Sequence, residues 1–129
     1  MWLDDLALYV RDQPLEGVDP DTITINSMPS DVQEGAVLLT GYRGMSVDPE
    51  LPGFHRGPMQ LIVRSRLSKR AEEIALTLSD VLTINEQVIA DNTFHYVRPL
   101  HLPVPFPKSN GDYYEASVNF DICFVRHIG

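Results

Sequence analysis

The pattern of hydrophobic and polar positions along the chain predicts two amphipathic helices. Apolar residues within positions 3–10 share one helical face, and Pro14 marks the end of that helix. A second apolar series runs from Ala71 to Leu82 with the spacing i, i+3, i+4, i+7 and i+11, and Ser68 is its expected N-cap. This spacing is typical of a helix that lies on a sheet.

The same pattern predicts about five strands. Residues 22–26 and 114–124 alternate between apolar and polar side chains, as in strands with one buried and one wet face. Residues 36–40 form a continuous apolar run, which favours a central strand covered on both faces. Further strand-like runs lie at 59–64 and 93–98.

The order of these elements is helix, three strands, helix and two strands, with a turn expected at Asn110-Gly111-Asp112 before the last strand. This order favours an α+β sandwich, with both helices packed on one face of a mixed or mostly antiparallel sheet. A length of 129 residues fits one domain, residues 1–129, that can bury a core without a metal or disulfide.

Two segments contain too much glycine and proline for regular structure. The first, residues 41–58, is predicted to be a long flexible loop, and loops of this kind often carry binding residues. The second, residues 99–110, contains Pro103, Pro105 and Pro107, which lack the amide donors that a central strand needs. This Pro-rich arm is expected to be an extended linker or an edge strand, packed on its own subunit or on a neighbouring one.

Cysteine content and hydropathy exclude several classes of protein. Cys123 is the only cysteine, so neither an intrachain disulfide nor a cysteine pair for zinc is possible. The first residues, Met1 to Asp5, lack the basic segment of a secretory signal, and no apolar run approaches the roughly 20 residues of a membrane helix. The sequence favours a reduced protein that is assembled inside the cell and has no membrane partner.

The charge of the chain is segregated along the sequence. The formal net charge is -8, yet six of the ten basic side chains fall within residues 43–70. The net charge of that stretch is +4, against -7 for residues 1–42 and -5 for residues 71–129. Such segregation lets copies of one protein join basic patch to acidic patch, although a solvated basic strand and helix start is the simpler explanation. The acidic excess disfavours a dedicated nucleic-acid-binding protein.

No residue pattern in the chain indicates catalysis, a metal or a cofactor. The four histidines, His55, His95, His101 and His127, lack the i, i+4 spacing of a helical zinc site. Neither Gly-x-Ser-x-Gly nor Gly-x-x-x-x-Gly-Lys occurs, and Cys123 is interpreted as a small buried hydrophobe. We expect no catalytic residue, metal or cofactor. An enzyme would instead need a pocket that converges on His55 or His101.

Three stretches of sequence point to a known family. They are LPGFHRGPMQLIVR at 51–64, the arm from Arg98-Pro99 to Asp112, and SVNFD at 117–121. In these stretches, and in the order of its predicted elements, the chain resembles small minor capsid or tail proteins of phages. The group that it resembles is the tail-terminator, or tail-completion, family of long-tailed phages.

The resemblance implies a structural virion protein rather than an enzyme. It implies a ring, typically a hexamer, that caps the head-proximal end of the tail tube, stops its polymerisation and contacts neck or connector proteins. The implied partners are other copies of the chain, the tail tube protein and the neck proteins, in a virion assembled in the host cytoplasm. DNA would pass through the lumen without specific binding. Alternatives are a head-completion or stopper protein, a tail tube subunit, and a small enzyme or nucleic-acid-binding module.

The family supplies no catalytic residue to carry over, so the residues expected at subunit, tail or neck interfaces are chosen for charge and loop character. The charges at Arg64 and Arg66 are expected to be exposed at the surface of the third strand. The full set of expected interface residues is Arg43, Phe54, His55, Arg56, Arg64, Arg66, Arg70, Val104 and Phe106.

Overall fold

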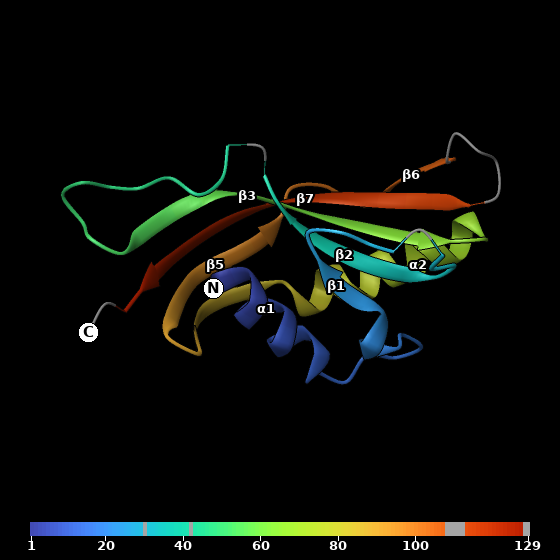
Figure 1. Cartoon of the computed structure of the whole chain (residues 1–129), viewed down its shortest axis with the longest axis horizontal. Helices are drawn as coiled ribbons and strands as arrows, with labels where there is room; N and C mark the ends of the chain where they lie inside the picture. The colour runs from blue at the N-terminus through green and yellow to red at the C-terminus, as the bar shows by residue number, and fades with distance from the viewer. Residues whose placement is uncertain (30, 42, 108–112, 128–129) are drawn as a thin grey trace.

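The computed structural model describes residues 1–29, 31–41, 43–107 and 113–127, and these residues form two α-helices and a seven-stranded sheet (Figure 1). In chain order the elements are α1 (Trp2–Arg11), the short 3-10 helix η1 (Pro20–Thr22), β1 (Ile23–Ile25), β2 (Gly35–Thr40), β3 (Phe54–Ser65), α2 (Ser68–Val81), β4 (Ile84–Ile89), β5 (Asn92–Pro99), β6 (Val104–Pro107) and β7 (Tyr114–Arg126). The fold is α+β, as predicted, but it contains more strands than the five expected.

The sheet is mixed, and β7 lies at its centre. The strand order is β1-β2-β3-β7-β5-β4, with β6 paired to β7 as well. Only the pair β1 and β2 is parallel within the described residues. One edge of β7 pairs with β3 along its length, so β5 and β6 share the other edge. β5 pairs with residues 120–126 and β6 with residues 114–117.

The longest pairing joins β3 to β7 over twelve residue pairs. It runs from Phe54 opposite Val125 to Ser65 opposite Tyr114. A ladder of this length spans about 36 Å, at roughly 3.3 Å per residue. In Figure 1 the two strands cross most of the long axis of the molecule, so the two ends of this ladder lie at opposite ends of the protein.

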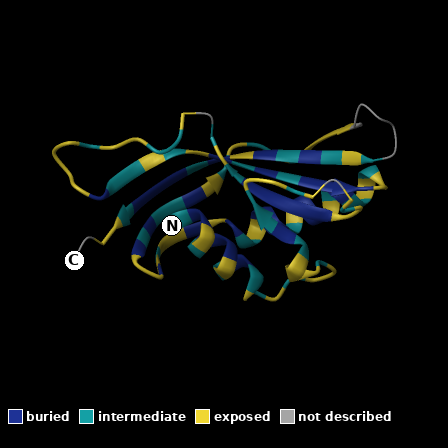
Figure 2. Cartoon of the chain, viewed as in Figure 1, coloured by how far each residue is buried: buried dark blue, intermediate teal, exposed yellow. Residues whose placement is uncertain are grey.

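One face of the sheet carries the hydrophobic core. Alternate residues of β7 from Ala116 to Phe124 are buried there, beside Met59, Leu61 and Val63 of β3. The apolar faces of both helices join the same core, and Figure 2 shows the buried residues between the helices and the sheet. The helix members of the core are Leu3, Leu6, Ala7, Val10, Ala71, Ile74, Ala75 and Leu78. The helical periodicity of the sequence therefore predicted the buried sides correctly.

The prediction of irregular structure up to Pro58 is wrong for the last part of the loop. Strand β3 already begins at Phe54, because residues 121–125 of β7 supply a hydrogen-bonding partner for the segment. Within the Pro-rich arm, Val104–Pro107 forms β6 at the edge of β7, which agrees with the expected edge strand. The turn predicted at 110–112 lies outside the described residues.

Two other local predictions are also wrong. Ser68 is the first residue of α2 and the N-cap is Leu67, which makes no side-chain cap hydrogen bond. Strand β4 is not evident in the sequence pattern because only its end residues, Ile84 and Ile89, are buried. Glu86 between them has a φ of 47°, so the apolar and polar positions do not alternate regularly.

Arg64 is buried, although its charge was expected at the surface. It is 6% exposed, on the face of the sheet away from the helices, and lies directly opposite Glu115. Its Nη1 donates hydrogen bonds to the carbonyl oxygens of Pro29 and Val32, both at 3.3 Å. Its Nε lies 3.4 Å from Oε2 of Glu115. The side chain therefore holds the segment before β2 against the sheet of its own subunit.

We predict that Arg64→Met lowers the free energy of unfolding by about 3 kcal/mol, because it leaves Glu115 nearly buried without its ion partner. Urea denaturation followed by circular dichroism measures this loss. The matched control is Arg66→Met at an exposed position, which should change stability by less than about 0.5 kcal/mol. Equal stabilities of the two variants would contradict the structural role of Arg64.

Candidate interaction surfaces at the two ends of the sheet

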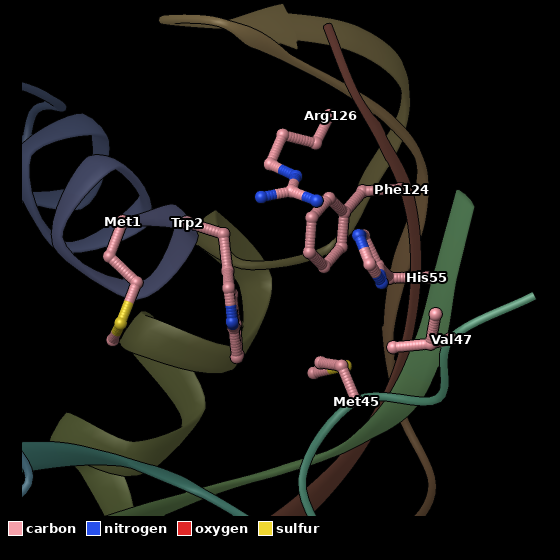
Figure 3. Close-up of a pocket in the computed structure, with 7 residues that line it drawn as sticks. All are labelled: Met1, Trp2, Met45, Val47, His55, Phe124 and Arg126. Carbon is pink, nitrogen blue, oxygen red and sulfur yellow. The ribbon is translucent and has the colours of Figure 1, made fainter. Parts of the chain in front are cut away.

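An apolar pocket lies at the end of the sheet where β3 begins and β7 finishes. It has a volume of about 320 Å³ and lies between the start of α1, the loop before β3 and the end of β7 (Figure 3). Its lining residues are Met1, Trp2, Met45, Val47, His55, Phe124 and Arg126. We call this site the aromatic pocket.

Phe124 is the centre of an aromatic cluster in the wall of this pocket. Its ring centroid lies 5.5 Å from that of Trp2, 5.2 Å from that of His55 and 5.3 Å from that of Phe94, all in tilted arrangements. Tilted aromatic pairs at such distances are favourable beyond the area that they bury. The wall is therefore preformed, and it joins α1, β3, β5 and β7 into one rigid support.

The loop before β3 forms the other wall because it packs back onto β3. The Ser46 amide donates to the Arg56 carbonyl at 2.7 Å, and His55 Nδ1 lies 2.9 Å from the Ser46 carbonyl oxygen. Gly57 permits this approach, since a Cβ at that position would meet the Gly44 carbonyl oxygen at 2.8 Å and Met45 Sδ at 3.0 Å. The absence of a side chain at Gly57 thus places Met45 over the pocket.

A polar cluster lies on the face of the sheet opposite the helices. Asp121 Oδ2 accepts from Arg56 at 3.3 Å, from the Tyr96 hydroxyl at 3.3 Å and from Arg98 at 3.5 Å. The Arg98 guanidinium carbon also lies 3.9 Å from the centroid of the Tyr96 ring. The hydrogen bond to Asp121 raises the pKa of Arg56, and burial raises the pKa of Tyr96. At neutral pH the cluster therefore presents two arginines held by one carboxylate.

The Pro-rich arm lies along β7 toward the opposite end of the sheet. Val104 and Phe106 supply the amide donors for pairing with β7, because Pro105 and Pro107 have none. The outer edge of β6 consequently lacks backbone donors at its prolines. A partner cannot continue the sheet there by regular strand addition and must contact the arm through side chains.

His101 fixes the arm in the segment between the end of β5 and the start of β6. Its Nε2 accepts a hydrogen bond from the Asn119 backbone amide at 3.1 Å. The imidazole thus takes the place of the carbonyl oxygen that a neighbouring strand would offer to this amide of β7. The proton of the neutral ring is then on Nδ1, which donates to the Leu102 carbonyl oxygen at 2.7 Å. His101 therefore positions the segment that carries Leu102.

Every second residue of the arm from Leu100 to Phe106 is an exposed apolar side chain. Leu100, Leu102, Val104 and Phe106 are 61%, 76%, 51% and 38% exposed. A shallow hollow of about 250 Å³ lies beside Leu102, lined also by Pro103 and by Glu72 and Leu76 of α2. We call residues 100–106 the apolar arm.

The nine residues expected at interfaces do not form one surface. Phe54, His55 and Arg56 lie at the start of β3, and Arg43 is exposed in the preceding loop. At the other end of the ladder are Arg64, Arg66, Arg70, Val104 and Phe106.

Two of the arginines near the end of β3 are engaged within their own subunit. Arg64 is buried, and the Arg70 Nε lies 3.2 Å from Glu34 Oε1. Arg70 also donates to the Gly17 carbonyl oxygen. Arg66 remains exposed, with its guanidinium carbon 6.0 Å from the Tyr113 ring centroid. Of this arginine group, Arg66 offers the most accessible charge for a partner.

Sequence reasoning missed the aromatic pocket itself. Trp2, Met45 and Phe124 come from segments that are distant in the sequence, so no local motif joins them. The available signals were Trp2 at the start of an amphipathic helix and Met45 within a Gly/Pro loop. Neither indicates a pocket without the pairing of β3 with β7.

All four histidines have structural partners. His127 Nε2 lies 2.7 Å from the Thr93 hydroxyl oxygen. His55 contacts the Ser46 carbonyl and His101 completes the β7 ladder, while His95 Nδ1 lies 3.1 Å from Glu86 Oε2. In the described part of the chain, no group of three or more His, Cys, Asp or Glu side chains could hold a metal ion. No helix there is long and apolar enough to cross a membrane.

Comparison with known proteins identifies the family. The sequence profile of a family described as "Bacteriophage tail terminator protein" matches residues 12–126. The chain belongs to this family. A solved structure titled "Virion of native gene transfer agent (GTA) particle" contains a similar chain, with a TM-score of 0.71 and 12% identity over 93% of this chain and 91% of that chain. No curated protein sequence matches significantly.

At 12% identity the likeness to the gene transfer agent chain establishes the fold alone. Membership of the tail terminator family establishes more, because it makes the protein a structural component of a phage tail in the virion and not an enzyme. A tail component associates with other virion proteins. The aromatic pocket and the apolar arm are the two apolar surfaces described above that this tail terminator family protein leaves open.

We predict that Gly57→Ala displaces the loop that closes the aromatic pocket, because the added methyl group would press on the Gly44 carbonyl oxygen. Amide hydrogen exchange at Ser46 should become faster, and the free energy of unfolding should fall by about 1–3 kcal/mol. The control is Leu67→Ala, at an exposed residue beside the other end of β3, which should leave Ser46 exchange unchanged. Unchanged exchange in Gly57→Ala would show that the loop does not depend on this contact.

Proposed function

We propose that the protein forms a closed ring, in its simplest form a hexamer, at the head-proximal end of the tail tube. There it ends tube polymerisation and joins the tail to the neck or connector proteins. The observation that carries this proposal is the match of the tail terminator family over residues 12–126, which covers nearly the whole fold. Because the family is a tail family, we interpret the surfaces described above as contacts with other tail or neck proteins.

The shape of the subunit supports assembly by head-to-tail contacts. The aromatic pocket and the apolar arm are different surfaces, set apart along the β3 to β7 ladder. Contacts between two different surfaces of one protein generate rings when the rotation closes. The exposed Arg43, Arg56 and Arg66 remain candidates for contacts with acidic surfaces of a neighbouring subunit or of the tail and neck.

The charge of the chain supports a lumen through which DNA passes without being held. The formal net charge is -8, and a surface that grips phosphates needs a basic excess instead. Three of the exposed basic residues, Arg56, Arg98 and Arg66, lie beside Asp121 or an aromatic ring. We therefore propose no specific nucleic-acid contact.

The test is to polymerise the tail tube protein of the same phage with and without this protein. We expect added protein to stop tube growth and to appear in negative-stain micrographs as a ring at one end of each tube. The expected dose dependence is a shorter mean tube length as the ratio of this protein to tube protein rises. Tubes of unchanged length without an end structure would contradict the proposal, and incorporation along the tube wall would identify a tube subunit instead.

A further inference from the structure

The aromatic pocket is an apolar cavity that the subunit leaves open. It has room for about 320 Å³, and Met1 and Val47 at its rim are 65% and 75% exposed. Phe124 behind it is 2% exposed, so this ring is already packed within the subunit and an occupant would contact the half-buried Trp2 and Met45 in front of it. Deep pockets with aromatic walls are where the side chains that dominate binding energy are usually seated.

The apolar arm has the complementary character, because it projects apolar side chains that its own subunit does not cover. Leu102, the most exposed of them, stands beside Leu76, which is itself 43% exposed. Pro103 and Pro105 stiffen the segment, so little conformational entropy is lost when it docks. The arm is therefore a preorganised ligand that lacks a site on its own subunit.

The arm cannot reach the pocket of its own subunit. Val104 and Phe106 pair with Ser117 and Glu115 of β7, whereas the pocket is built on Phe124. Seven to nine residues of extended strand separate these positions, which corresponds to about 23–30 Å. The pairing of β6 with β7 fixes that separation, so an arm that fills this pocket must come from another copy.

The charges around the two surfaces are also complementary. Arg126 lines the pocket and is exposed, so the pocket carries one basic side chain. Glu72 lines the hollow beside Leu102, so the hollow carries one acidic side chain. Opposite charges at the rim favour the docking of arm to pocket and disfavour contacts of pocket to pocket or arm to arm.

We propose that the aromatic pocket of one copy receives the apolar arm of the next, with Leu102 seated among Trp2, Met45 and Val47 and with Glu72 near Arg126. The contact is heterologous and repeats around the assembly, and the prolines of the arm prevent the sheets of neighbouring copies from fusing at this edge. This inference rests on the proposed function, because the contact between arm and pocket is the subunit contact that the proposed ring requires.

The test is disulfide cross-linking between two single-cysteine additions. Val47→Cys protein is mixed with Leu102→Cys protein under mild oxidation, with and without tail tubes, and the covalent dimer is measured on a non-reducing gel. The native Cys123 does not interfere, because it is 5% exposed and burial raises the pKa of its thiol. We expect a covalent dimer in the mixture and little in either protein alone.

A matched control replaces Val47→Cys with Val88→Cys, at an exposed valine of β4 that lies outside the pocket. This mixture should give about tenfold less dimer than the mixture with Val47→Cys, as expected if only the pocket binds the arm. A dimer yield equal to that of the control, with or without tubes, would overturn the inference. Cross-linking of Val47→Cys to the tube protein instead of the arm would overturn it as well.

A second measurement uses charge in place of cysteine. Leu102→Asp and Val47→Asp should each weaken self-association about tenfold, because a carboxylate would enter an apolar contact, whereas Val88→Asp should not. Circular dichroism verifies that each variant is folded. Unchanged association in both pocket and arm variants would overturn the inference.

These results remain distinct from those of the tube-capping test. Capped tubes without the cross-link between residues 47 and 102 would leave the proposed function standing and would remove only this contact. A specific cross-link in a protein that neither caps tubes nor changes their length would establish the contact and remove the proposed function.

Discussion

The pairing of β3 with β7 is the constraint on which the rest of the structure depends. Its twelve residue pairs set one face of both strands toward the helices and the other toward solvent. A shift of one residue would turn every core side chain of β7 to the wrong face, so the buried residues from Ala116 to Phe124 specify the register strongly. Because β7 also pairs with β5 and β6, this register fixes the position of nearly every other strand.

The same ladder separates the two surfaces that we assign to assembly. At one end the aromatic cluster around Phe124 needs Trp2 from α1 and His55 from β3, so it exists only in the folded subunit. Toward the other end, β6 is held on β7 while its prolines leave the outer edge without amide donors. The protein can therefore present a long edge segment to partners and still avoid uncontrolled strand addition.

How much could be predicted from the sequence depends on whether a residue's partners are close in the chain. The two helices and β7 were predictable because their periodicity reports one buried face directly. Strand β4 was not, because Glu86 has a positive φ of 47° and only the end residues of the strand are buried. Arg64 appeared to be one member of an exposed basic stretch, and only the fold brings Glu115, Pro29 and Val32 around it.

The candidate site shows the same limit. Val104 and Phe106 could be chosen from the sequence because prolines at alternate positions indicate an extended edge segment. The pocket could not, since Trp2, Met45 and Phe124 are joined only by tertiary structure. The charge pattern was informative in a coarse way, because it indicated a partner surface but did not distinguish the buried Arg64 from the exposed Arg66.

In the proposed assembly, copies of this chain join head to tail into one closed ring at the end of the tail tube. Cryo-electron microscopy of intact tails that carry the protein tests it most directly. We expect a single ring at the head-proximal end, in which residues 100–106 of each copy lie in the aromatic pocket of the next. Copies located elsewhere on the tail, or a ring whose subunits touch through other surfaces, would contradict it.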